Sequence, residues 1–226
     1  MNKRIIDYLQ SVEISHSFAM KYNHGVQSIN ADGKWDLFEP TRFVYAFFAL
    51  NMIYSIDWHR TIESNSMKYH NYRTGKNAQD QISEVIDFVY SNSNELFQEC
   101  LLKFDSNRGL FSVVCQMDID YNSSRPSRRD GNNTIAQDFL RASKKFTDCI
   151  NLDADDHFDL MQMSYTVRNN LFNGEKKAYQ MREKGHRNRL LHYGNIILAT
   201  NESFFETLKN KFGYRRIDNY EIQDNL

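Results

Sequence analysis

Two segments in the last third of the chain combine residue types that can hold a phosphate group and move a proton. The first, SYTVRNNLFNGEKK, places Arg168 and Asn169 near the predicted end of a helix, just before the helix-ending turn Asn173–Gly174. The second, HRNRLLHYGNIIL, opens the next predicted helix and contains Arg187 and His192. Arginine binds phosphate oxygens through its planar fork, and histidine exchanges protons near neutral pH. The two segments therefore hold the candidate site residues.

A basic stretch joins these two segments. From Glu175 to Arg189 the chain carries six lysines and arginines against two glutamates. Because the formal net charge is −1, only a local patch of this kind can attract a nucleic acid. For any single residue here, an ordinary solvated loop position is the alternative. The candidate RNA-binding residues are Lys176, Lys177, Arg182, Lys184 and Arg189.

The pattern RNNLFNGEKK, together with the arginine-rich start of the following helix, resembles the HEPN superfamily. The motif of that family is an arginine, four to six intervening residues and a histidine, and the resemblance covers about residues 160–208. It implies an up-and-down helical bundle and a cofactor-free, metal-independent endoribonuclease of the bacterial toxin or antiphage-defence type. It also implies that RNA is the substrate, that Asn169 orients Arg168, and that two copies of the motif face each other in a homodimer. An antitoxin or a defence-system protein is a further partner that such a setting suggests.

The sequence departs from the family at the residue that would move protons. Asn173 stands where the motif has histidine, and an asparagine cannot take up or release a proton near pH 7. We therefore expect the chain as written to be nearly inert as a ribonuclease. Two explanations stay open: an inactivated form of a toxic enzyme, since one base change converts a histidine codon to an asparagine codon, or a non-catalytic module that binds RNA, a nucleotide or a protein. A plain helical interaction protein with a chance motif is a third reading.

Arg187 and His192 also satisfy the motif spacing, with the histidine intact. On one continuous helix, residues five apart diverge by about 140° around the axis, which is poor geometry for shared work. We therefore rank Arg168, Asn169 and Asn173 as the catalytic candidates and the second pair as the second choice. A basic first helical turn with a boundary histidine is the plain alternative for that pair.

Other classes of site find no support in the sequence. There is no Walker loop, no GxGxxG, HExxH or GxSxG, and the three cysteines are too far apart for a metal site or a paired CxxC. These cysteines predict a reduced, cytoplasmic chain. The longest apolar run, residues 43–56, is too short to span a membrane. It contains Asn51, for which we expect a buried, clamping position.

Composition and apolar spacing predict the elements that position these residues. Nine glycines and two prolines in 226 residues are too few for the turns of a β-sandwich, barrel or propeller, so the fold class is all-α. We expect one HEPN-like domain over 1–226, with an irregular insertion at about 105–135 and the motif-bearing part at about 155–212. Apolar periodicity predicts helices at about 4–28, 38–59, 79–104 with a break near 91–94, 134–149, 153–172 and 187–212.

Overall fold

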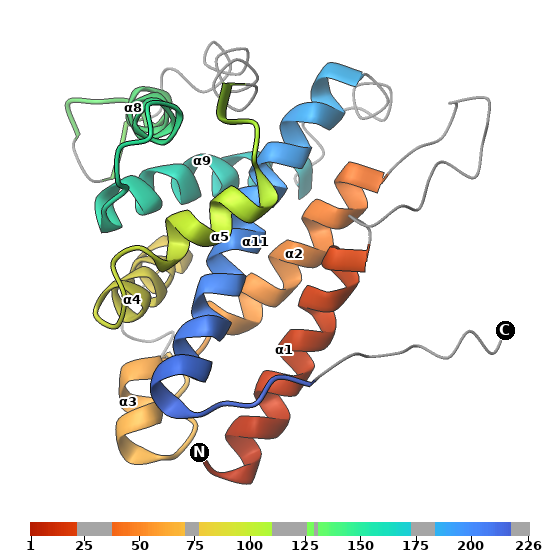
Figure 1. The fold of residues 1–226 in the computed structure, drawn as a ribbon, viewed down its shortest axis with the longest axis vertical. Coiled ribbons are helices and arrows are strands. Elements are labelled where there is room, and N and C mark those ends of the chain that lie inside the picture. Colours follow the sequence, from red (N-terminus) through yellow and green to blue (C-terminus); the bar gives the residue numbers. More distant parts are fainter. Residues whose placement is uncertain (22–37, 71–76, 110–125, 129–130, 173–183, 218–226) are drawn as a thin grey trace, which may run out of the picture.

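The structure, a computed structural model, describes residues 1–21, 38–70, 77–109, 126–128, 131–172 and 184–217. Within these ranges the chain forms eight α-helices and no β-strand, which confirms the all-α prediction (Figure 1). None of the described helices is long and apolar enough to cross a membrane. The helices are α1 (Lys3–Lys21), α2 (Phe38–Tyr54), α3 (Trp58–Ser64), α4 (Ala78–Tyr90), α5 (Leu96–Phe104), α8 (Ile135–Thr147), α9 (Ala154–Phe172) and α11 (Lys184–Phe212).

Helix α11 is the central element of the bundle. It has 29 residues and packs against α2 and α5 most extensively, and also against α9, α4 and α1 (Figure 1). Its buried apolar side chains include Tyr193, Ile197 and Phe204. At Gly194 an added Cβ would lie 3.8 Å from the Cα of Phe43, so α11 and α2 approach closely at this point. Helix α11 thus contacts α9, the other helix that carries candidate residues, as well as α2.

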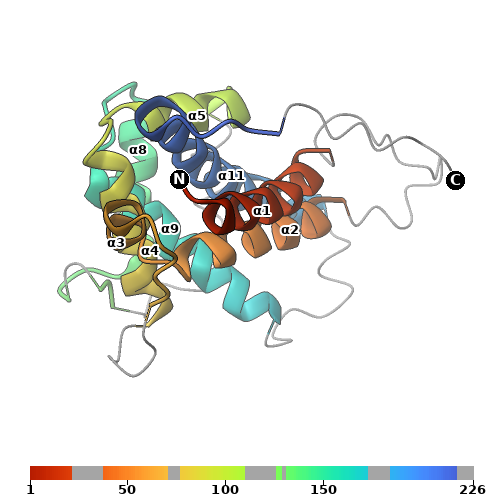
Figure 2. The same ribbon diagram turned by 90° about the horizontal axis from the view of Figure 1, so that it is seen from below.

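Helix α2 packs against both α1 and α11, which explains why it is apolar on most sides, and Figure 2 shows α1 and α2 side by side. Phe43 and Phe47 are at most 2% exposed. The expectation for Asn51 is wrong, because this residue is exposed on the strip of α2 that faces solvent. At the interface between α2 and α11, the buried amide belongs to α11: Nδ2 of Asn201 donates to the carbonyl of Ala46 at 3.0 Å.

Polar side chains set the helix boundaries. The helix predicted over 38–59 is in fact two helices, because Asp57 caps α3 by accepting a hydrogen bond from the backbone N–H of Arg60 at 3.1 Å. The predicted break near 91–94 is confirmed, since it separates α4 from α5. Thr134 and Gln137 form a reciprocal capping box at the start of α8.

Ion pairs join the acidic start of α9 to α8. Asp153 caps α9, and its Oδ1 accepts from the N–H of Asp156 at 2.9 Å. Asp156 receives Nζ of Lys145 at 2.6 Å and Nη1 of Arg141 at 2.9 Å, and Asp159 pairs with the same arginine. The carboxylates of Asp156 and Asp159 are fully buried, so these cations neutralise charges that would otherwise be costly inside the bundle.

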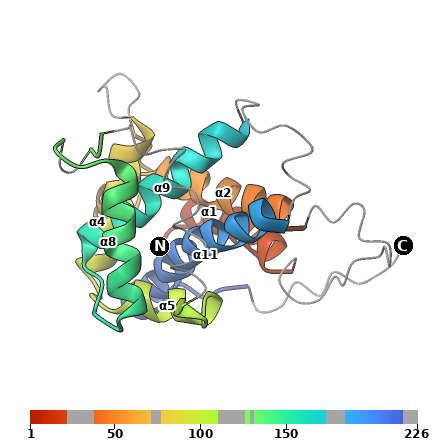
Figure 3. The same cartoon turned by 90° about the horizontal axis from the view of Figure 1, so that it is seen from above.

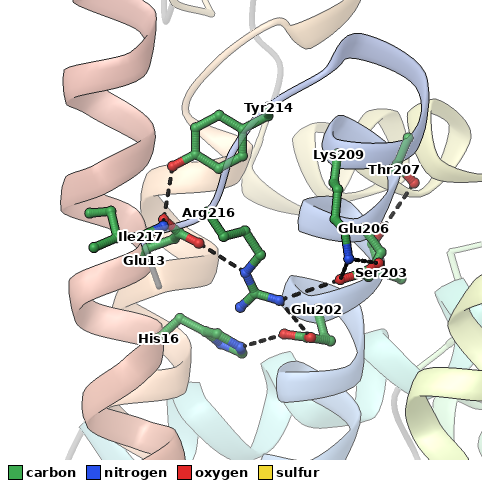
Figure 4. Close-up of polar contacts among 10 residues, drawn as sticks. All are labelled: Glu13, His16, Glu202, Ser203, Glu206, Thr207, Lys209, Tyr214, Arg216 and Ile217. Atoms are coloured by element: carbon green, nitrogen blue, oxygen red, sulfur yellow. Dashed lines mark hydrogen bonds and ion pairs between the residues drawn. The ribbon is translucent and has the colours of Figure 1, made fainter. Parts of the chain in front are cut away.

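The last described residues fold back from α11 onto α1 (Figure 4). Gly213 reverses the chain with a φ of 65°, a left-handed conformation that favours glycine. The hydroxyl of Tyr214 donates to Oε2 of Glu13 at 2.9 Å. Arg216 donates from Nε to Oε1 of Glu13 at 2.9 Å and from Nη1 to Oε1 of Glu202 at 2.6 Å. One guanidinium therefore bridges carboxylates on α1 and α11.

Candidate functional site

The described part of the motif lies at the C-terminal end of α9. The guanidinium carbon of Arg168 lies 5.2 Å from the ring centroid of Phe47 on α2 and 5.8 Å from that of Tyr165, one turn earlier on α9. Its Nη1 donates to Oδ1 of Asn169 at 2.9 Å. Two aromatic rings and an amide thus restrain a partly buried arginine, the side chain best suited to holding phosphate oxygens.

Several candidate residues cannot be placed as side chains. Lys184 and Arg187 belong to the first turns of α11, but the positions of their side chains are not described. Their predicted roles stay predictions. Four other predicted site residues, Asn173, Lys176, Lys177 and Arg182, lie outside the described residues.

The second-choice pair lies on one uninterrupted helix. Because α11 begins at Lys184, Arg187 and His192 are both inside it and diverge by about 140° around its axis. Two side chains this far apart around one helix are poorly placed to act on the same group, so this pair stays the second choice. His192 is 3% exposed and faces the interior of the bundle.

A buried polar cluster surrounds His192. Its Nδ1 is hydrogen-bonded to the carboxylate of Asp105, the residue that ends α5. One turn further along α11, Oδ1 of Asn195 accepts from Nη1 of Arg42 at 2.7 Å, and its Nδ2 donates to the carbonyl of Phe104 at 3.0 Å. These groups hold α11 against α2 and α5. They position the helix that follows the motif.

Three members of this cluster, Arg42, Asp105 and Asn195, were not predicted from the sequence. Arg42 and Asn195 did leave a signal, because each is a polar residue next to an otherwise apolar stretch. Asp105 left none, since an acid after a helix is ordinary. Arg189, a predicted RNA contact, lies one turn before His192 and is only 8% exposed, so it packs among the helices.

Charge is distributed unevenly along α9 and α11. The first six residues of α9 include three aspartates, whereas residues 160–172 contain no acid and include Arg168. The start of α11 contains Lys184, Arg187 and Arg189, and the first acid on this helix is Glu202. In Figure 3 the C-terminal end of α9 and the N-terminal end of α11 lie on the same side of the bundle. In the sequence these two helix ends therefore carry more cations than acids.

A cavity at the acidic end has the opposite character. It measures about 530 Å³, and its lining includes Tyr90, Glu95, Gln98 and Asp153. Burial raises the pKa of Tyr90, and the nearby carboxylates of Asp153 and Asp156 raise it further. The lining includes the carboxylates of Glu95 and Asp153, which disfavour an RNA phosphate in this cavity.

The other buried titratable groups have structural partners. His157 stacks on Phe97 with ring centroids 3.4 Å apart, and its Nε2 lies 2.8 Å from Oγ1 of Thr200. Burial lowers its pKa well below 6.5, so this imidazole is neutral. Burial raises the pKa of Glu202, but hydrogen bonds from His16 and Arg216 outweigh that effect and lower it to about 2. Among the described residues, no cluster of histidine, cysteine, aspartate and glutamate could hold a metal ion.

Comparisons with known proteins add no assignment. No protein-family model, curated protein or solved structure matches the chain. The functional interpretation therefore depends on the motif, on the contacts of Arg168 and on the charge distribution around it.

Proposed function

We propose that this chain is a HEPN-type, metal-independent endoribonuclease of a toxin or antiphage-defence system, silenced at its proton-transfer position by Asn173. In this proposal Arg168 binds the scissile phosphate and Asn169 orients the arginine. The basic residues between α9 and α11 hold the RNA strand. As written, the chain binds RNA and cleaves it very slowly.

The observation that supports this proposal most is the restrained guanidinium of Arg168. It combines the contact to Asn169 at 2.9 Å with the flanking rings of Phe47 and Tyr165. A fixed arginine at a helix end is what electrostatic stabilisation of a phosphorane-like transition state requires, because the charge is in place before the reaction starts. The absence of acids from residues 160–172 keeps carboxylates on this part of α9 from competing for that charge.

The chemistry explains why one residue decides activity. Cleavage without a metal starts with removal of the proton from a 2′-hydroxyl, whose oxygen attacks the adjacent phosphorus. The 5′-oxygen leaves with a proton, and the product carries a 2′,3′-cyclic phosphate. A histidine supplies such proton transfers at neutral pH, whereas an asparagine only forms hydrogen bonds. In a homodimer, the two copies of Arg168 would converge on one composite site.

A non-catalytic RNA-binding module is the second candidate, and Asn173 itself favours it. Both functions use the same phosphate contacts. They differ in whether a histidine at position 173 produces cleavage, so substitution at that position separates them.

Growth of cells that express the protein provides the test. Asn173→His should slow growth sharply on induction, whereas the unchanged chain and Asn173→Gln should be tolerated. The double variant Asn173→His with Arg168→Ala should be tolerated as well, because the phosphate contact is gone. Equal growth of all four, at equal levels of folded protein, would leave only the binding module.

A further inference from the structure

Three aromatic side chains form an exposed surface where α1 and α2 pack together. Phe18 of α1 stacks on Tyr45 of α2, with ring centroids 5.6 Å apart and an interplanar angle of 27°. Tyr45 also meets Phe48 edge to face at 6.1 Å. Phe18 is 38% exposed and Phe48 is 46% exposed. We call these three residues the aromatic platform. Adjoining exposed rings of this kind are typical of a binding surface.

The platform and the candidate phosphate site are connected through α2. Phe47, the neighbour of Phe48, contacts both Tyr165 and Arg168 of α9. In Figure 3 the C-terminal ends of α1 and α9 and the N-terminal ends of α2 and α11 lie on the same side of the bundle. A polymer whose phosphate is held at Arg168 can therefore continue along α2 to the platform.

Few acids lie in the helix segments near the platform. The part of α1 that follows Glu13 contains no acid, and neither do residues 160–172 of α9 nor residues 184–201 of α11, whereas α2 carries one acid, Glu39, at its N-terminal end. The described cation that reaches α2 is Arg168, whose guanidinium lies over the ring of Phe47. A purely apolar protein partner would need the rings but not the cations. Single-stranded nucleic acid uses both, because bases stack on aromatic side chains while phosphates bind lysine and arginine.

We propose that the aromatic platform stacks unpaired bases of the RNA strand whose phosphate binds Arg168. This inference rests on the proposed function and adds the form of the substrate, which is single-stranded RNA. Every base has a flat face to stack, so the platform gives affinity without selecting a sequence. Bases inside a duplex are already stacked on one another, so the platform disfavours double-stranded RNA.

Fluorescence anisotropy of a labelled, unstructured RNA with the chain as written tests the proposal. Phe48→Ala should weaken binding about 5- to 150-fold, the usual range for losing one stacked base, whereas Phe48→Trp should retain it. The slope of log affinity against log salt should not change, because no charge is removed. Tyr69→Ala is the matched control, since Tyr69 is also exposed, at 53%, but contacts Tyr8 in the first half of α1. It should bind like the unchanged chain.

An abasic strand of the same length separates stacking from other effects. Phe48→Ala and the unchanged chain should bind it equally, because it offers no base to stack. The proposal is overturned if Phe48→Ala binds the normal RNA like the unchanged chain while Arg168→Ala weakens binding, an outcome that leaves the proposed function intact. It is also overturned if Phe48→Ala lowers the sedimenting mass or the melting temperature, because the rings would then belong to a protein contact. No binding of RNA by the unchanged chain would overturn both proposals.

Discussion

The amide of Asn169 holds the guanidinium of the residue that precedes it, with its Oδ1 2.9 Å from Nη1 of Arg168. Successive side chains on an α-helix project about 100° apart, so the long arginine side chain must bend around the helix axis to make this contact. The bend leaves its guanidinium beside the rings of Phe47 and Tyr165. Asn169 is therefore a positioning residue for Arg168, and both are testable without any cleavage activity.

Removing the guanidinium should weaken RNA binding. We expect Arg168→Ala to lose about 10- to 150-fold in affinity, since a hydrogen-bonded charge contributes roughly 1.5–3 kcal/mol. The slope of log affinity against log salt should fall by about 0.7, the value for one phosphate contact on a single strand. Asn169→Ala should weaken binding less and leave that slope intact, because the charge remains. Anisotropy titrations at several salt concentrations measure both quantities.

Lys209→Ala provides the control for that experiment. Lys209 is exposed near the other end of α11, where it pairs with Glu206 at 3.3 Å. Its replacement removes one charge of the same sign and should leave affinity and slope nearly unchanged. If Lys209→Ala and Arg168→Ala behave alike, RNA binds by net charge alone and Arg168 has no special role.

His157 should make the stability of the fold depend on pH. Its folded pKa lies well below the ordinary value of 6.5, so below pH 6.5 the unfolded chain binds a proton that the folded chain does not. The free energy of unfolding should therefore fall as pH is lowered from 6.5, by about 1.4 kcal/mol per unit from this group. Urea titrations between pH 7.5 and 5 should show that His157→Gln loses this component. His59→Gln, at an exposed imidazole, should keep it. If the free energy of unfolding varied with pH in the same way for His157→Gln and for the unchanged chain, the prediction would be contradicted.

Loss of Arg216 should destabilise the whole bundle. Its side chain neutralises Glu13 and Glu202, and the side chain of Glu13 is only 5% exposed. Arg216→Ala leaves these carboxylates without their shared cation, so we expect a loss of about 3 kcal/mol in the free energy of unfolding. Arg215→Ala, at the exposed neighbouring position, should stay within about 0.5 kcal/mol of the unchanged chain. If Arg216→Ala and Arg215→Ala lowered the free energy of unfolding equally, the turn at Gly213, and not the ion pairs of Arg216, would hold the last described residues against α1.

The sequence predicts the helices well where local signals agree. Apolar periodicity and capping residues such as Thr134 and Asp153 depend only on near neighbours, so they can be read from the chain directly. The division between α2 and α3 was missed, because apolar residues continue across it and hide the cap at Asp57. Asn51 was misplaced because an apolar stretch does not show which narrow strip of a helix faces solvent.

Long-range polar pairs were beyond sequence reasoning. Arg42 and Asn195 are 153 residues apart, and Asp105 and His192 are 87 apart, so no local rule joins either pair. For the candidate site, residue type and spacing name Arg168 and Asn169, and their roles stay predictions. The ring of Phe47 reaches Arg168 from α2, a contact between distant segments that no local rule predicts.

Cleavage of RNA by Asn173→His, in the presence of excess chelator, tests the central claim most directly. In the proposed function the chain lacks only a titratable group at the motif, and proton transfer contributes on the order of 100- to 10,000-fold in rate. The controls are Asn173→Gln, which cannot transfer a proton, and the double variant with Arg168→Ala. A further double variant with His192→Gln checks the second-choice histidine.

The account predicts metal-independent cleavage by Asn173→His that leaves 2′,3′-cyclic phosphate ends, at least 100-fold faster than that by the unchanged chain. Cleavage should vanish with Arg168→Ala and persist with His192→Gln. No cleavage by a folded, dimeric Asn173→His protein would contradict the account, and so would cleavage that depends on His192 and not on Arg168.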